Sequence, residues 1–123
     1  MFSLNEKDVQ KLKKFPTYSQ DGKGKDAEII LKVFNPYGRG TWYVLEAEEI
    51  NNGTDYYCFG YVESPLNPLY DEYGYFTINQ LKEVKIPIKI KDMATGEIHE
   101  LGYGNLEIDR SLDDGIKLKD VLN

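Results

Sequence analysis

Residues 32–46 read Lys-Val-Phe-Asn-Pro-Tyr-Gly-Arg-Gly-Thr-Trp-Tyr-Val-Leu-Glu, and this stretch holds the only tryptophan, Trp42. Apolar residues dominate both of its ends, whereas a proline and two glycines occupy its middle. Proline limits strand pairing and glycine permits a positive φ angle, so the middle predicts a turn between two strands. We therefore expect the first hairpin of an antiparallel sheet, with strands over residues 27–34 and 41–47.

Side chains alternate between the two faces of a strand, which assigns a face to each residue of the second strand. On this basis, one face carries Thr41, Tyr43, Leu45 and Ala47. The other face carries Trp42, Val44 and Glu46. Trp42 and Val44, together with Phe34 of the first strand, are candidates for the core, and the turn tip at residues 36–39 is left exposed.

Helix signals occur twice in the chain. Ser3 and Glu6 have the spacing of a capping box, so a helix is predicted over residues 3–14, and Pro16 ends it. Thr77 and Gln80 have the same spacing and predict a second, short helix over residues 78–84. A terminal helical turn is expected over residues 117–122.

The remaining strands follow from alternation and turn residues. The turn Asn-Asn-Gly at 51–53 leads into a strand over 56–63, and further strands are predicted over 73–76, 86–91, 97–100 and 106–109. The predicted fold is therefore α+β: a mostly antiparallel, twisted sheet of five to seven strands, an N-terminal helix and one short helix after Thr77. A chain of 123 residues fits a single domain over residues 1–123.

Composition excludes several classes of protein. The net charge is −6, and residues 26–84 carry three basic against ten acidic groups, so we expect no nucleic-acid binding. No apolar run is long enough to span a membrane, and charged residues follow Met1 too early for a signal peptide. The single cysteine, Cys58, permits no internal disulfide. These features predict a soluble cytoplasmic protein.

The sequence carries no recognised catalytic or metal-binding motif. His99 and Cys58 are the only histidine and the only cysteine, and 41 positions separate them, which is not the spacing of zinc ligands. The serines lie in no nucleophile elbow, and the glycines at 22 and 24 have the wrong spacing for a phosphate loop. We therefore expect no metal, no cofactor and no catalytic residue, and a non-catalytic role is the favoured hypothesis.

Three blocks of the chain resemble a known family when they are taken in order. They read Lys-Val-Phe-Asn-Pro-Tyr-Gly-Arg-Gly-Thr-Trp-Tyr at 32–43, Phe-Gly-Tyr-Val at 59–62 and Glu-Tyr-Gly-Tyr-Phe-Thr-Ile-Asn-Gln-Leu at 72–81. On these blocks the chain, over about residues 4–84, resembles the domain-of-unknown-function family 2958, which is found in bacteria, plasmids and phages. The resemblance implies a common fold and a link to mobile genetic elements, and it implies no activity.

The C-terminal part of the chain resembles the family less closely. The family ends with Ile-Glu-Arg-Asp-Leu, and the nearest match here is Ile-Asp-Arg-Ser-Leu at 108–112. An apparent inserted hairpin at residues 86–103 separates this segment from the preceding blocks. Glu46, Glu72, Asp109 and Arg110 match or nearly match polar positions of the family. They predict either a paired-acid site or an ion pair from Arg110 to one of these acids.

Aromatic residues are the second group of candidates for a site. Tyrosine and tryptophan are frequent anchors of protein interfaces, so these rings predict an exposed binding face. The alternative is that they pack between the sheet and the helices. The candidate residues are Tyr37, Trp42, Tyr43, Tyr57, Tyr61, Tyr73 and Tyr75, with Arg39 beside Tyr37 in the turn.

Three hypotheses for function follow. The first is a non-catalytic binding or accessory module that contacts an unknown protein partner through the 36–39 turn, the neighbouring aromatics and the 64–72 loop. The second is an acidic inhibitor of a host defence nuclease, whose carboxylates imitate phosphates; those carboxylates are Glu46, Glu48, Glu49, Asp55, Asp71 and Glu72. The third is an enzyme that uses Glu72, Asp109 and Arg110.

Overall fold

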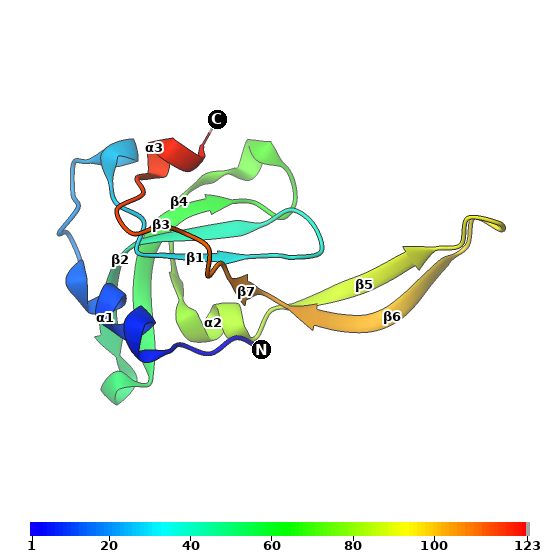
Figure 1. Ribbon diagram of the computed structural model, residues 1–123, viewed down its shortest axis with the longest axis horizontal. Helices are drawn as coiled ribbons and strands as arrows, with labels where there is room; N and C mark the ends of the chain where they lie inside the picture. Colours follow the sequence, from blue (N-terminus) through cyan, green and yellow to red (C-terminus); the bar gives the residue numbers. More distant parts are fainter. Residues whose placement is uncertain (123) are drawn as a thin grey trace.

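The computed structural model describes residues 1–122 and has the predicted α+β architecture (Figure 1). The helices are α1 (Glu6–Lys14), α2 (Ile78–Lys82) and α3 (Leu118–Val121), with three short 3-10 turns, η1 (Gly24–Asp26), η2 (Asn51–Gly53) and η3 (Pro68–Tyr70). The strands are β1 (Leu31–Phe34), β2 (Thr41–Ile50), β3 (Asp55–Glu63), β4 (Glu72–Thr77), β5 (Lys85–Lys91), β6 (Ile98–Asn105) and β7 (Glu107–Ile108).

Five strands form one antiparallel sheet in the order β4-β3-β2-β1-β7. The predicted first hairpin is confirmed, because Val33 pairs with Trp42 and the amide of Asn35 donates to the carbonyl of Gly40. The predicted strand over 27–34 is shorter than expected. Its first part leaves the sheet ladder: the amide of Ile29 donates to the carbonyl of Ile116 instead.

Two apolar clusters cover the two faces of this sheet. The first lies under α1 and α2 and includes Leu12, Val33, Val44, Cys58 and Ile78. The second lies under the C-terminal segment and α3, and it includes Ala27, Ile29, Tyr43, Leu45 and Leu118. Figure 1 shows α2 and α3 on opposite sides of the strands. The sheet is thus covered over β1 and β2 on both faces.

A β-bulge in β2 overturns part of the predicted face assignment. Val44 pairs with Gly60 and Glu46 pairs with Phe59, so Leu45 is an extra residue in the ladder. An extra residue reverses the alternation of every residue after it. Glu46 therefore lies on the face opposite to Trp42 and Val44, and Ala47 packs in the first cluster. The prediction that placed Glu46 with Trp42 was wrong for this reason.

The first helix begins three residues later than predicted. Asn5 is its N-cap: the Asn5 side chain accepts a hydrogen bond from the amide of Asp8, and the Asp8 carboxylate accepts one from the amide of Asn5. This capping box has the same spacing as the predicted box of Ser3 and Glu6, which does not form. The predicted box of Thr77 and Gln80 is present at the start of α2.

Strands β5 and β6 form an arm that extends away from the rest of the molecule (Figure 1). In the described part of the chain they pair only with each other, and this arm is the hairpin that the sequence placed at residues 86–103. At its base, the side-chain amide of Asn105 donates to the carbonyl of Val84 at 3.3 Å. Within residues 1–122, no helix has the length and apolar character needed to cross a membrane.

Candidate functional site

Five aromatic rings stand side by side on one face of β3 and β4. Strand alternation brings Tyr57, Phe59 and Tyr61 of β3 to the same face as Tyr73 and Tyr75 of β4, and the register pairs Phe59 with Tyr75. The centroids of Tyr57 and Tyr75 are 5.3 Å apart, and those of Phe59 and Tyr73 are 5.9 Å apart, both in stacked geometry. Tyr61 meets Tyr73 edge-on at 5.1 Å. We call these five residues the aromatic face.

The aromatic face is open to solvent along its outer half. The exposed fractions are 42% for Tyr57, 40% for Tyr73 and 56% for Tyr75. Phe59 and Tyr61 are partly buried against the second apolar cluster. The second apolar cluster is covered by α3 and the C-terminal segment, which pack over β1 and β2. This cover ends before the outer half of the aromatic face. A row of rings on an edge strand and its neighbour is thereby left without a covering α-helix or strand in the described chain.

A cavity of about 260 Å³ lies where the aromatic face meets the loop that joins α1 to β1. Phe59, Tyr73 and Tyr75 supply its aromatic wall. The loop supplies the facing wall, and β2 contributes the remainder. Its other lining residues are Tyr18, Gln20, Asp21, Gly22, Gly24, Ala27, Leu45 and Glu46.

Glu46 fixes the loop that forms this cavity. Its side chain is buried, and its two carboxylate oxygens accept hydrogen bonds from the amides of Tyr18 and Gln20, at 2.8 and 2.9 Å. The buried side chain of Gln20 then donates to the carbonyls of Glu28 and Leu45, and it accepts from the amide of Glu28. The loop is therefore attached to β2 by side-chain hydrogen bonds, and Tyr18 is held exposed with a φ of 70°.

The other aromatic candidates lie elsewhere. Trp42 packs against the first cluster, on the opposite face of the sheet from the aromatic face. Tyr43 is buried, its hydroxyl donates to Glu63 at 2.7 Å, and its burial raises its pKa. Tyr37 is half-exposed in the 35–40 turn, where its ring lies against Gly104 at the base of the arm. The predicted aromatic set is therefore divided between the aromatic face and three other places.

Arg39 forms an ion pair with another residue of the same chain, Asp71. Its Nη2 atom donates to both carboxylate oxygens of Asp71, at 2.7 and 2.6 Å. Asp71 also accepts a hydrogen bond from the amide of Ser64. The contact with Arg39 lowers the pKa of Asp71, and the contact with Asp71 raises the pKa of Arg39. This contact joins the 35–40 turn to the segment that precedes β4.

The carboxylates and the arginine that the sequence grouped do not meet. Glu72 begins β4 at one edge of the sheet, whereas Asp109 follows β7 at the other edge. The Nζ atom of Lys32 lies 3.2 Å from Oδ2 of Asp109. The Asp109 carboxylate also accepts hydrogen bonds from the hydroxyl and the amide of Ser111. The Ser111 hydroxyl, its amide and Lys32 lower the pKa of Asp109. Glu46 lies on the central strand β2, away from both edges of the sheet.

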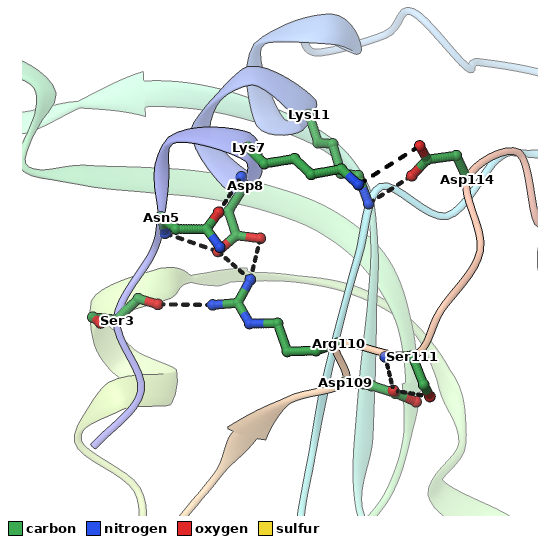
Figure 2. Close-up of polar contacts among 9 residues, drawn as sticks. All are labelled: Ser3, Asn5, Lys7, Asp8, Lys11, Asp109, Arg110, Ser111 and Asp114. Atoms are coloured by element: carbon green, nitrogen blue, oxygen red, sulfur yellow. Dashed lines mark hydrogen bonds and ion pairs between the residues drawn. The ribbon is translucent and has the colours of Figure 1, made fainter.

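The ion pair predicted for Arg110 does form, but with a different partner. Figure 2 shows that its guanidinium points to the start of α1, where Nη1 lies 2.6 Å from both oxygens of Asp8. Its Nη2 donates to the carbonyl of Ser3. The prediction that Arg110 pairs with Glu46, Glu72 or Asp109 was therefore wrong. Asp8 is the buried carboxylate of the capping box, so it needs a cationic partner more than an exposed acid such as Glu72 does.

Cys58 and His99 lie in different parts of the structure. Cys58 is buried in the first cluster, and this burial raises the pKa of its thiol to about 12. His99 is exposed on the arm. Among residues 1–122, no group of three or more His, Cys, Asp and Glu side chains is arranged as a metal site.

Sequence reasoning missed two parts of the cavity. Tyr18 and Gln20 lie in a polar loop whose only signal was its glycines and charges. Phe59 lies in the strand predicted over 56–63 and in a family block, but it was not predicted as a site residue. Its position between Tyr57 and Tyr61, with an alternating strand pattern, was the signal that placed it on the aromatic face.

Comparison with known proteins gives one result. The family model described as protein of unknown function, DUF2958, matches residues 4–107. The chain belongs to the DUF2958 family. No curated protein and no solved structure matches it. The DUF2958 match contains the aromatic face, the cavity and the arm, and it ends before Asp109 and Arg110.

Proposed function

We propose that this DUF2958 protein is a non-catalytic binding module, and that it binds a protein partner through the aromatic face. The observation that carries the proposal is the exposure of Tyr57, Tyr73 and Tyr75 in a continuous row of stacked rings. Exposed apolar patches of this kind mark interaction sites, and tyrosine is among the residues that dominate binding energy. The proposed contact surface therefore lies on β3 and β4, whereas the sequence hypothesis included the 36–39 turn.

The aromatic face is suited to binding because its rings are already ordered. Each ring on β4 contacts a ring on β3, so little side-chain freedom remains to be lost on association. Tyrosine also adds a hydroxyl at the rim for hydrogen bonds to a partner. These properties favour affinity without any change in the fold of the sheet.

The acidic-inhibitor hypothesis receives less support. Of the six carboxylates that were expected to imitate phosphates, Glu46 is buried and Asp71 is paired with Arg39. Asp55 is also buried, and it accepts a hydrogen bond from the amide of Asn79 at the start of α2. Of the acids that remain exposed, Glu48 and Glu49 pair with residues at the start of β3. Glu72 pairs with Val62 near the end of β3, so it lies apart from them. The enzyme hypothesis loses its site, because Glu72 and Arg110 lie at opposite edges of the sheet.

Two features of the proposal rest on the sequence. The resemblance to proteins of plasmids and phages suggests a partner encoded by, or acting on, a mobile element. The lone, buried Cys58 suits the reducing cytoplasm. The partner should therefore be sought in intact cells of the native host.

Photocrosslinking tests the proposal. Benzoylphenylalanine replaces Tyr75 in the host protein, and a matched variant carries it at Tyr103, a tyrosine on the arm that is at least as exposed. We expect a discrete crosslinked partner from position 75 and not from position 103. The partner is then purified and its affinity measured for the wild type and for Tyr73→Ala/Tyr75→Ala. Loss of two interface anchors should weaken binding by about 30-fold or more. Unchanged affinity, or no crosslink from position 75, would overturn the proposal.

A further inference from the structure

We propose that the cavity beside the aromatic face takes a cationic side chain, a lysine or an arginine of the protein partner. This inference rests on the proposed function and names the chemistry of its central contact. Three observations support it: the aromatic rings in the wall, the sign of the charges around the cavity and the fixed shape of the loop that closes it.

Aromatic side chains provide one wall of the cavity. Phe59, Tyr73 and Tyr75 line it together, and Phe59 and Tyr75 are inclined at 53° with centroids 5.1 Å apart. Tilted rings form a corner, and a cation placed in a corner can contact two ring faces. The faces of aromatic rings carry negative electrostatic potential, and this attracts ammonium and guanidinium groups.

The charged groups around the cavity have one sign. Asp21 and Glu46 are the charged residues that line it, and no lysine or arginine does so. Lys23, which lies between Gly22 and Gly24 in the loop, is directed to the ring of Phe15, with its Nζ 6.0 Å from the ring centroid. A cation entering the cavity thus meets two carboxylates and no like charge. A phosphate at the same place would be repelled by both acids.

The cavity is built before a partner arrives. Glu46 and Gln20 hold the loop through buried hydrogen bonds to its backbone, so the distance between loop and rings is fixed by the fold. The volume of about 260 Å³ admits one extended side chain together with a few water molecules. This size favours a single anchoring residue of a protein partner.

The experiment is an NMR titration of the full, ¹⁵N-labelled chain with defined probes. The cationic probes are acetyl-Gly-Arg-Gly-amide and acetyl-Gly-Lys-Gly-amide. The neutral control replaces arginine by citrulline, which has nearly the same shape without the charge. Adenosine monophosphate represents the rival ligand class, because bases also stack on aromatic rings.

We expect saturable shifts at the amides of Gly22, Gly24 and Tyr75 with both cationic peptides. The citrulline peptide should bind at least about tenfold more weakly, and adenosine monophosphate should give no shift at these amides. Tyr75→Leu should weaken the binding of the arginine peptide by about two- to thirtyfold, the range of one cation–π contact. Tyr103→Leu, on the arm, is the matched control and should bind like the wild type. Spectra of the free variants check that each is folded.

Equal binding of the arginine and citrulline peptides, tighter binding of adenosine monophosphate, or no shift with either cationic peptide would each overturn the inference. None of these results changes the outcome of crosslinking from position 75, so the binding-module proposal is judged separately. Conversely, a crosslinked partner that binds equally well after its contacting Lys or Arg is replaced by Gln would refute the cationic anchor alone.

Discussion

Arg110 and Asp8 are 102 positions apart in the chain, and the Nη1 atom of Arg110 lies 2.6 Å from both carboxylate oxygens of Asp8. The side chain of Asp8 is 5% exposed, whereas that of Arg110 is 50% exposed. The same carboxylate caps α1 by accepting from the amide of Asn5. One buried charge therefore orders the start of the first helix and anchors the segment after β7 to it.

Removing the arginine should destabilise the fold. Arg110→Ala leaves the buried carboxylate of Asp8 without its cation, and we expect a loss of about 1–3 kcal/mol in the free energy of unfolding. Equilibrium urea denaturation measures it. Lys119→Ala is the control, because its ion pair with Asp26 is exposed to solvent and should contribute nothing measurable. Equal stability of Arg110→Ala and the wild type would contradict this role.

Two paired glycines of the sheet should respond in opposite ways to the same substitution. Gly60 of β3 and Gly74 of β4 face each other in the register. A Cβ atom on Gly60 would overlap the carbonyl oxygen of Tyr43, whereas one on Gly74 would meet nothing within 4 Å. Gly60→Ala must therefore push β2 and β3 apart, at a cost of about 3 kcal/mol or more.

Gly74→Ala is the matched control for that experiment. It should leave the free energy of unfolding unchanged or raise it by about 0.5 kcal/mol, because alanine reduces the freedom of the unfolded chain. Thermal denaturation of both variants decides between them. If both substitutions had the same effect, the close approach of β3 to Tyr43 would be wrong.

The carboxylate of Glu46 should control the order of the cavity loop. Glu46→Gln replaces one acceptor oxygen by an amide group that cannot accept from a backbone amide, so one of the hydrogen bonds to Tyr18 or Gln20 is lost. We expect a destabilisation of about 1–3 kcal/mol, together with faster hydrogen exchange at these two amides. Glu48→Gln, an exposed acid on the same strand, should alter neither. Unchanged exchange in Glu46→Gln would show that the loop is held by other contacts.

Acid should weaken the contacts of Asp109. Its pKa is lowered in the folded protein, so its contribution to stability is present above its unfolded value of 3.8 and is lost as the pH falls through the lower folded value. Asp109→Asn should cost less than about 1 kcal/mol at pH 7, since Lys32 and Asp109 are both partly exposed. The difference from the wild type should shrink as the pH falls below 3.8. A difference independent of pH would assign the effect to packing instead of charge.

Much of the fold was predictable because its signals are local. The turn at Asn51 and Asn52 is set by residues that accept a positive φ, and α2 starts at a capping box contained within four residues, beginning at Thr77. Alternation along β3 and β4 likewise depends on neighbouring positions only. Such features need no information about the rest of the chain, and the structure confirms them.

The site was harder to predict because it depends on one irregularity and on distant contacts. The bulge at Leu45 places Glu46 on the same face as Phe59. A leucine at that position does not indicate an extra residue in the ladder. The partner of Arg110 lies in the first helix, beyond the reach of any pattern in the sequence. Asp8 itself looked like an ordinary helix residue, because its burial follows from the contact that could not be foreseen.

The arm has a consequence for protein engineering. Its two strands hydrogen-bond to each other and to no other described strand, so the five-stranded sheet keeps every ladder contact whatever the length of β5 and β6. A two-stranded hairpin in water is only marginally stable, and it should unfold and refold without the body. The turn at Thr95 and Gly96 is therefore an insertion point, where an epitope, a fluorophore or a second domain can be carried without redesigning the rest.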